Sequence, residues 1–550
     1  MAVVLLIATF AVGTGASFSS DEGAAIVQAK HLAAGQGWIL ENPFPALDPT
    51  GERSFLALSD HGANGTAAYS KHPTYPVVLA GLDRIGGVTA MVLLSVLGTL
   101  VAAGLAARLA ARFGDRYARP TVWAVAIGSP LLFDSQLVIA HSLGAALAAG
   151  ALLAVVRARE RWSWAMVVVA AACLGAACLL RNEAILLSAV VAVVLLWAAV
   201  RTRAPRLGVL AVAVVGAAGL AAVFDRVASA RIIGAAFTAA GPVSPGSDFL
   251  SSRIGALAST AVLPGDSWPP VAQVGLMLVF GGVTAAGLAA RTRPDDARLV
   301  RFGCGAAVLG VVLAFAGGQP DTIPGLFVAC PFLWAGLLLV RRQQVATEPA
   351  RFLAAVVVAF VVLVVLVQYS QAGAAEWGAR FLAIVLPAAV PLALVSIDRA
   401  GRRLAPADAR IGLVSLVVVT AAISVLSLWS LHHYKGLNRD WTRFVASAAD
   451  DWRDEVAQPG GDGRPVVITT WAGLGRLMWP EDVDVRGMTV EATDLRSTLE
   501  QLRAAGVTEV VYVAPGSGPD REAFRGLYEQ VDVRPEGRVD KGPVFLLRAI

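Results

Sequence analysis

Charged residues are scarce in this sequence, and so are cysteine, lysine and asparagine. Asp, Glu, Lys and Arg supply 15% of the 550 residues and hydrophobic residues supply 56%, whereas a soluble domain carries about 25% charged residues. The composition therefore excludes an ordinary soluble globular protein. The four cysteines all lie in apolar runs, without a CxxC pair or a His at metal-ligand spacing. No disulfide framework or zinc pattern is indicated. Lysine and asparagine occur four times each, a bias typical of a GC-rich bacterial genome.

Motifs for nucleotide and hydrolase chemistry are absent as well. The sequence has no GxxxxGKS/T phosphate loop, no HExxH zinc pair and no GxSxG between a strand and a helix. The net charge of +5 does not indicate a nucleic-acid partner. The arginines form short clusters between apolar runs, where membrane topology accounts for them.

Long apolar runs dominate what is present. Runs of about 17–25 apolar residues bounded by charge predict transmembrane helices, and the chain has about thirteen of them. The first run, Met1–Phe18, lacks a basic n-region and a cleavage site, so we interpret it as an anchor and not a signal peptide. The predicted spans are 1–18, 76–107, 120–138, 141–156, 163–180, 184–200, 207–224, 271–290, 300–316, 323–340, 352–368, 380–397 and 411–431.

Arginine is distributed unevenly between the connections. Clusters follow the even-numbered spans, as at Arg108–Arg119 and Arg399–Arg410, while the other short connections hold almost none. The positive-inside rule places the arginine-rich connections in the cytoplasm. The loops 19–75, 225–270 and 369–379 and the tail 432–550 are then predicted to lie outside.

The tail has the pattern of a small α/β domain. Residues 466–470, 507–513 and 544–548 are predicted strands bounded by Gly and Pro. Residues 491–505 have helical apolar spacing and precede Gly506, a predicted C-cap. An amphipathic helix over 438–456 joins the tail to the membrane. The predicted domains are a transmembrane domain, 1–431, which includes the outer loops 19–75 and 225–270, and an extracytoplasmic α/β domain, 432–550.

Polar residues gather on the predicted outer side. Two adjacent carboxylates, Asp21 and Glu22, follow the first span, where they serve either as helix-capping residues or as a functional pair. Lys71 and His72 precede the second span, together with Tyr69. They are either interfacial anchors or ligands of an anion.

Further polar residues stand at later outer turns. Arg181 breaks the arginine pattern and has Glu183 two residues away, so a local ion pair is the alternative to a functional role. Glu376 and Arg380 precede the twelfth span. Asp134 and His141 flank the turn between the third and fourth spans, where such a residue is more often a packed, hydrogen-bonded helix-end residue than a catalyst.

The order of these motifs resembles the GT-C superfamily of membrane glycosyltransferases. Within it, the chain is most similar to the branch that includes protein O-mannosyltransferases and aminoarabinose transferases. It departs from that pattern at His141, where the family often has a carboxylate, and in a displaced second proline after Lys71. The matching segments are Asp21-Glu22, Lys71-His72-Pro73, Arg181-Asn182-Glu183 and Gly378-Ala379-Arg380-Phe381-Leu382 with Pro387.

The resemblance implies a polytopic α-helical fold and roles for individual residues. Asp21 is the expected catalytic base. The residues expected to bind the donor phosphate are Lys71, Arg380, His72 and Arg181, and those expected to bind substrate are Glu22, Tyr69, Glu376 and His141. No metal ligand and no cofactor is indicated, and a divalent metal requirement stays open.

The implied activity is transfer of a hexose or pentose from a polyprenyl-phosphate donor to an acceptor hydroxyl. The acceptor is a glycan, a lipid or a protein on the outer face of the cell membrane, and the anomeric centre is inverted. Nucleotide sugars are confined to the cytoplasm, so an outward-facing transferase needs a lipid-carried donor, whose phosphate favours Arg or Lys. The alternatives are a transporter or lipid flippase, which predicts internal symmetry and paired broken helices, and a non-catalytic envelope scaffold.

Overall fold

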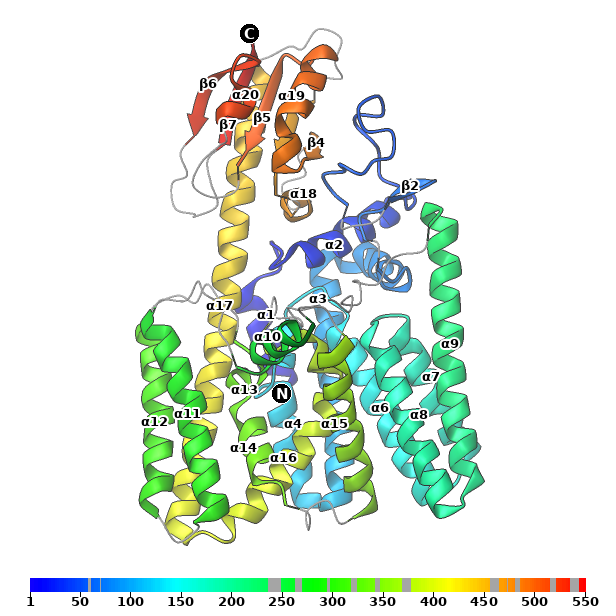
Figure 1. Ribbon diagram of the computed structural model, residues 1–550, viewed down its shortest axis with the longest axis vertical. Coiled ribbons are helices and arrows are strands. Elements are labelled where there is room, and N and C mark those ends of the chain that lie inside the picture. The colour runs from blue at the N-terminus through cyan, green and yellow to red at the C-terminus, as the bar shows by residue number, and fades with distance from the viewer. Residues whose placement is uncertain are drawn as a thin grey trace. The chain divides into compact units, whose positions relative to one another are not determined.

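The computed structural model describes most of the chain, which folds into two units (Figure 1). Unit 1 comprises Met1–Val12, Val92–Phe224 and Ala239–His432, and unit 2 comprises Gly13–Met91, Asp225–Thr238 and His433–Ile550. Unit 2 therefore combines the segment after the first span with the tail. The described residues are 1–57, 61–69, 71–235, 249–262, 270–293, 297–317, 324–341, 347–367, 377–455, 464–471, 473–479, 485–514, 521–534 and 544–550.

Apolar helices form most of the described chain, as the composition predicts. Nine helical segments in the described ranges are long and apolar enough to cross a membrane, and α1 (Ala2–Val12) and α7 (Trp164–Cys178) are shorter apolar helices. The predicted polytopic membrane protein is confirmed. The nine are α3 (Thr74–Ala110), α6 (His141–Glu160), α8 (Glu183–Thr202), α9 (Pro205–Ile233), α11 (Pro270–Thr292), α12 (Ala297–Ala316), α15 (Glu348–Val367), α16 (Leu386–Gly401) with the preceding 3-10 turn η4 (Arg380–Val385), and α17 (Pro406–Glu455).

Two predicted spans are not continuous helices. The run 120–138 is divided into α4 (Ala118–Ala126) and α5 (Leu131–Asp134), with Pro130 between them. The run 323–340 is divided into α13 (Leu326–Ala329) and α14 (Pro331–Leu339) at Cys330, whose φ of −135° and ψ of 69° are not helical. A proline disfavours the helical conformation of the preceding residue. Continuous hydropathy therefore hides a break in each run.

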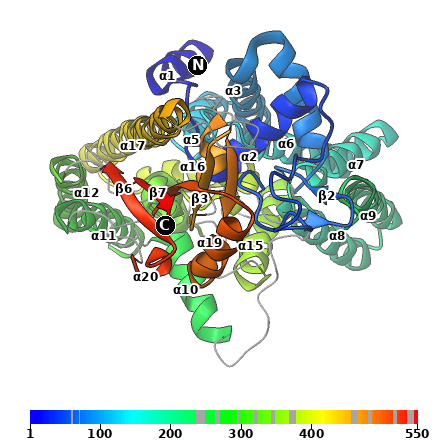
Figure 2. The same ribbon diagram turned by 90° about the horizontal axis from the view of Figure 1, so that it is seen from above.

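Close packing of glycine joins two helices of unit 1. Helices α11 and α12 lie side by side in both views (Figures 1 and 2). A Cβ atom on Gly282 would lie 2.5 Å from the backbone nitrogen of Ala307, and one on Gly310 would lie 2.5 Å from the carbonyl oxygen of Gly275. Small residues of this kind allow membrane helices to approach closely where lipid supplies no hydrophobic driving force.

A five-stranded mixed sheet forms the centre of unit 2. The strand order is β4-β3-β5-β7-β6, with β3 parallel to both β4 and β5, and β7 antiparallel to β5 and β6. The predicted strands at 466–470, 507–513 and 544–548 are confirmed, whereas β4 and β6 were not predicted. The strands are β3 (Val466–Thr469), β4 (Arg486–Thr489), β5 (Glu509–Val513), β6 (Tyr528–Arg534) and β7 (Val544–Ala549).

Both faces of this sheet are covered. Ile468, Tyr512 and Phe545 pack with α19 (Leu495–Ala504) on one face, while Val467 and Val511 pack against the last turns of α17 on the other. Alternate residues of a strand point to opposite faces. Because both faces are covered, the residues on each face are apolar, and the strands appear in the sequence as continuous apolar runs. Helix α19 ends in a Schellman arrangement at Gly506 (φ 84°), as its predicted C-cap requires.

The segment after α2 (Ser20–Ala33) is part of the same core. Phe44 packs in the α19 face and Phe55 in the α17 face. The carbonyl of Arg53 accepts a 2.9 Å hydrogen bond from the Thr489 amide, next to a bridge between Ser54 and Met488. Unit 2 therefore needs residues from both ends of the chain. Its remaining short elements are β1 (His61–Gly62), β2 (Gly65–Thr66), α18 (Leu474–Leu477), the 3-10 turn η6 (Ala492–Asp494) and α20 (Arg521–Phe524).

Candidate active site

The first turn of α2 carries two carboxylates with different surroundings. Ser19 is the N-cap, and its hydroxyl accepts a 3.3 Å hydrogen bond from the Glu22 amide. Neither Asp21 nor Glu22 is thus needed to cap the helix. Successive residues of a helix point about 100° apart, which directs the two side chains to different neighbours.

Glu22 is enclosed by protein. Its carboxylate accepts a 2.6 Å hydrogen bond from the Phe18 amide, and it lies 3.7 Å from Lys435 Nζ. Its side chain is 1% exposed. The Asn438 side-chain amide donates to the carbonyls of Ser17 and Phe18 at 2.8 and 2.9 Å. Glu22 therefore fixes the chain that enters α2.

Asp21 instead meets the lysine that precedes α3. Its Oδ2 lies 2.5 Å from Lys71 Nζ, and the side chains are 24% and 34% exposed. Gln28 lies two turns after Asp21 on the same face of α2, and its side-chain oxygen accepts hydrogen bonds from the amides of Ala68 and Tyr69. These bonds hold the segment that precedes Lys71 along α2. The structure thus brings Asp21 together with the segment that contains Tyr69 and Lys71, two features that the sequence predicted separately.

Two further residues of unit 2 reach this region. Arg476, on α18, is buried, and its Nη1 donates to the Ala57 carbonyl at 3.0 Å. Burial lowers the pKa of Arg476 to about 10, and the nearby Asp21 carboxylate opposes that shift. His72 Nδ1 lies 3.1 Å from Oδ2 of Asp225, which lies on α9 two turns before the helix ends. Sequence reasoning found neither Arg476 nor Asp225.

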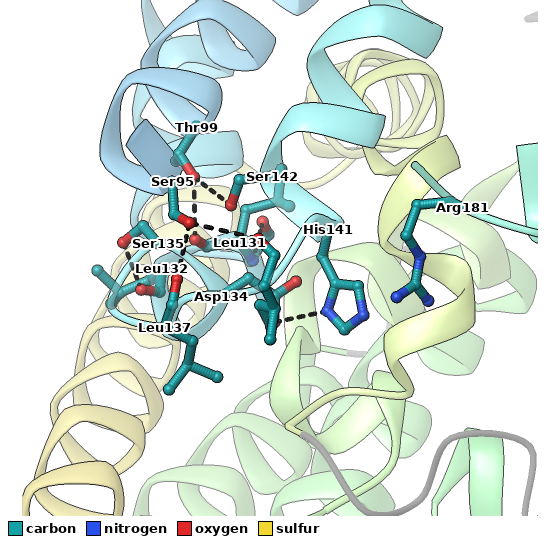
Figure 3. A network of polar contacts seen from close by, with 12 residues as sticks. Ser95, Thr99, Leu131, Leu132, Asp134, Ser135, Leu137, His141, Ser142 and Arg181 are labelled. Carbon is teal, nitrogen blue, oxygen red and sulfur yellow. Dashed lines mark hydrogen bonds and ion pairs between the residues drawn. The ribbon is translucent and has the colours of Figure 1, made fainter. Parts of the chain in front are cut away.

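Unit 1 contains a separate polar cluster, which Figure 3 shows at close range. Asp134 lies at the end of α5 and His141 at the start of α6, with Oδ1 and Nδ1 3.6 Å apart, and their side chains are 1% and 2% exposed. Thr99 on α3 donates to Ser142 at 2.9 Å, and Ser95 donates to the Leu137 carbonyl at 2.7 Å. These hydrogen bonds attach α3 to the turn that holds the pair.

Arg181 lies on the other side of the His141 imidazole from Asp134 in Figure 3. Its Nε and Nη2 donate to the Glu183 carboxylate at 3.0 and 2.8 Å. The local ion pair considered from the sequence is therefore present, and it has the bidentate geometry that makes such pairs strong. The Arg181 stem also packs on Gly144 of α6, where a Cβ would lie 3.1 Å from it.

Arg380 follows a constrained turn in unit 1. Gly378 and Ala379 have φ values of 73° and 62°. A positive φ suits glycine but is unfavourable for Ala379. Trp377 stacks on Phe133 at 5.9 Å, and a Cβ on Gly378 would lie 2.2 Å from Pro130. The Arg380 guanidinium lies over the Phe381 ring at 5.1 Å. Glu376, a predicted substrate residue, lies outside the described residues.

No group of three or more His, Cys, Asp or Glu residues that could hold a metal ion occurs in the described ranges. What the unit 2 cluster offers is a carboxylate beside an ammonium group, both within reach of solvent. A carboxylate of this kind can accept a proton, and an ammonium group can bind an anion.

Comparisons with known proteins find similarity in structure and not in sequence. No protein-family model matches the chain, and no curated protein sequence matches it. ArnT from Cupriavidus metallidurans bound to undecaprenyl phosphate is similar with a TM-score of 0.53 and 13% identity, over 99% of this chain and 96% of that chain.

The archaeal oligosaccharyltransferase AglB from Archaeoglobus fulgidus is also similar. In complex with an inhibitory peptide and a dolichol-phosphate, it matches with a TM-score of 0.51 and 12% identity, over 93% of this chain and 69% of that chain. The chain therefore shares the fold of ArnT and AglB, which agrees with the polytopic helical fold that the resemblance of its motifs implied.

Proposed function

We propose that this chain transfers a sugar from a polyprenyl-phosphate donor to an acceptor hydroxyl on the outer face of the cell membrane. The observation that carries the proposal is the partly exposed pair formed by Asp21, in the first turn of α2, and Lys71, which precedes α3, with the two side chains 2.5 Å apart. The fold supports the proposal, because the similar structure of ArnT is bound to undecaprenyl phosphate and that of AglB is in complex with a dolichol-phosphate. A hexose or pentose donor and a glycan, lipid or protein acceptor fit the proposal.

Asp21 is the proposed general base. The acceptor oxygen attacks the anomeric carbon from the side opposite the phosphate, and the bond from that carbon to the phosphate oxygen breaks. The electron pair leaves with the phosphate, while the Asp21 carboxylate takes the acceptor proton. This reaction needs no cofactor to balance, and attack from the opposite side inverts the anomeric centre. Glu22 is the less suitable base because Phe18 and Lys435 occupy its carboxylate.

Lys71 is the proposed ligand of the donor phosphate. Without donor its ammonium group pairs with Asp21. The donor phosphate is a phosphodiester with one negative charge and gains a second as its bond to the sugar breaks, and the flexible four-carbon stem of lysine can turn toward it. Donor binding then draws Lys71 from Asp21 and leaves the carboxylate able to accept a proton. The two roles are thereby ordered, with the donor first and deprotonation second.

The other residues predicted to bind the donor phosphate are His72, Arg380 and Arg181, and we keep them in the proposal. His72 is held by Asp225, which fixes the backbone next to Lys71. In unit 1, Arg380 is the proposed donor ligand that follows the constrained turn. Arg181 shares its guanidinium with Glu183, so a phosphate would have to compete with a carboxylate for it.

The proposed side of the reaction follows from the arginine-rich connections. Their positions support an orientation in which Asp21 and the tail lie outside the cytoplasm. A reporter fused after Ile550 that is active only outside the cytoplasm is expected. A reporter active only in the cytoplasm would contradict both the orientation and the outer-face reaction.

Deletion and complementation test the activity itself. Mass spectrometry of envelope glycans, lipids and proteins should show loss of a hexose or pentose mass increment after deletion. Wild-type protein should restore the increment, and Asp21→Asn should not. Glu41→Gln is a matched control, because Glu41 forms an exposed pair with Arg464 in the same unit at 3.0 Å. An unchanged glycan profile after deletion would contradict the proposed function.

A further inference from the structure

A single helical turn of the tail packs directly on the helix that carries Asp21. Helix α18 lies against α2, and a Cβ on Gly23 would be only 2.0 Å from the Arg476 carbonyl oxygen. On the other side of α18, a Cβ on Gly475 would be 2.2 Å from the Phe55 carbonyl oxygen. The backbone of α18 is thus held between α2 and the loop that follows it, with no room for a side chain at either glycine.

The side chain carried on this turn is a buried cation. Arg476 is 4% exposed, and its Nη1 donates to the Ala57 carbonyl at 3.0 Å. Arg476 interacts electrostatically with the Asp21 carboxylate. With a pKa of about 10, Arg476 stays charged at neutral pH although burial disfavours the charge. A tail arginine is therefore kept ionised beside the proposed base.

Asp21 consequently faces two cations with different freedom. Lys71 is about one-third exposed on a flexible stem, whereas the guanidinium of Arg476 is enclosed and hydrogen-bonded. Three other charged groups on or beside α2 have partners of their own. Glu22 pairs with Lys435 at 3.7 Å, Lys30 lies over the Trp479 ring at 5.0 Å, and His72 contacts Asp225 at 3.1 Å.

We propose that Arg476 is a positioning residue for Asp21, so that the C-terminal part of the chain completes the active site. When Lys71 turns to the donor phosphate, Arg476 keeps the carboxylate ionised and oriented toward the acceptor. Arg476 touches neither donor nor acceptor in this role. The inference rests on the proposed function, because it takes Asp21 as the base.

Arg476→Gln tests the role in the purified full-length protein with an undecaprenyl-phosphate sugar that wild-type protein uses. The turnover number kcat should fall by about ten- to a hundredfold, the loss expected when a reacting group is misplaced, while the donor KM changes little. Loss of a nearby cation should move the acidic limb of the pH–rate profile upward by about one unit. A purely structural role would lower the amount of active protein without moving that limb.

Arg486→Gln is the matched control. Arg486 is also a tail arginine that donates to a carbonyl of the segment after α2, to Pro43 at 3.0 Å, and it stacks on Phe44 at 4.5 Å. It has no interaction with Asp21 among the described residues. Its replacement should cost similar packing and leave the acidic limb where wild-type protein has it. Equal kinetic effects of the two variants would overturn the inference.

Arg476→Lys keeps the test open if Arg476→Gln does not fold. Lysine retains the charge, so the acidic limb should stay near the wild-type position while kcat falls by less than in the Gln variant. An upward shift in Arg476→Lys equal to that expected for a neutral residue would refute the electrostatic role. A raised donor KM with unchanged kcat would show that Arg476 binds phosphate instead.

The failure of this inference can be separated from failure of the proposed function. If Asp21→Asn transfers sugar at the wild-type rate, the assignment of the base is wrong whatever Arg476 does. If Asp21→Asn is inactive and Arg476→Gln behaves like Arg486→Gln, only the positioning role is wrong. In the Asp21→Asn background, Arg476→Gln should have almost no further effect on turnover, because both act through one carboxylate.

Discussion

The polar cluster on α2 in unit 2 and the polar cluster around α5 and α6 in unit 1 each pair an Asp with a basic side chain, but the two pairs differ in solvent access. Asp21 and Lys71 are about a quarter and a third exposed, whereas Asp134 and His141 are almost fully enclosed. A carboxylate that must receive a proton from a substrate needs a path to it. An enclosed pair is better suited to fixing helix ends. Residue type alone therefore does not distinguish the two pairs, whereas solvent accessibility does.

The largest expected effect follows from removing the exposed carboxylate. Asp21→Asn keeps the shape and most hydrogen bonds but removes basicity, so turnover should fall by about two to four orders of magnitude. Donor binding should be largely kept. Single-turnover transfer in liposomes, with Glu41→Gln as control, measures the change. Near wild-type transfer by Asp21→Asn, combined with an inactive Glu22→Gln of normal folding, would move the base to the enclosed carboxylate and break the comparison.

The next effect concerns the cations. Lys71→Ala and Arg380→Ala should each weaken donor use by about one to two orders of magnitude, since a charge-assisted bond contributes roughly 1.5–3 kcal/mol. Donor saturation curves measure this. Lys30→Ala is the matched control, because Lys30 lies on α2, the helix that carries Asp21, but its ammonium group contacts the Trp479 ring. Unchanged saturation in both Lys71→Ala and Arg380→Ala would refute the phosphate assignment.

The enclosed cluster should respond in stability instead. His141→Asn should lower the free energy of unfolding by on the order of 1–3 kcal/mol, because it leaves the buried Asp134 carboxylate with a poorer neighbour. Thermal unfolding in detergent, with turnover measured on the folded fraction, separates the two quantities. The substrate contact that the sequence predicts for His141 would instead raise an acceptor or donor KM at unchanged stability, and that result would place the enclosed cluster in the active site.

The smallest expected effect is on the alkaline stability of unit 2 and not on transfer activity. Burial raises the pKa of Tyr528 to about 12, and its hydroxyl donates to the Val507 carbonyl at 2.9 Å. A raised folded-state pKa gives stability that is complete below the unfolded value of about 10 and is lost as pH rises toward about 12. Tyr528→Phe should abolish this alkaline loss in pH-dependent unfolding. Transfer activity near neutral pH should not change, and a change would show coupling between the sheet and the site.

Local sequence signals account for much of the fold. Apolar runs and arginine clusters predict the membrane helices, and Gly506 predicts the end of α19, because these signals act over a few residues. Pro130 and Pro331 are also local signals for the breaks in two runs, but continuous hydropathy obscured them. The strands β4 and β6 escaped prediction because Arg486–Thr489 and Tyr528–Arg534 are short or polar and gain their place from neighbouring strands.

The candidate site was predictable in part for the same reason. Asp21 and Lys71 stand at the ends of apolar runs, where charge is conspicuous, and Lys71 is one of only four lysines. Arg476 and Asp225 carry no comparable signal. Arg476 lies 455 positions after Asp21 in the sequence, and only the close approach of α18 to Gly23 brings them together. A surface arginine and a buried one look alike until that contact is known.

The core of unit 2, which combines residues from both ends of the chain, can be completed only late in biosynthesis. Phe44 and Phe55 are translated roughly 400 residues before the strand at Val466–Thr469 that they help to cover, a delay of about 20–80 s at ordinary elongation rates. During that interval the two aromatic rings have no sheet to pack on. A ribosome stalled before the tail would thus release a chain with exposed aromatic surface, which makes late truncations targets for chaperones and proteases.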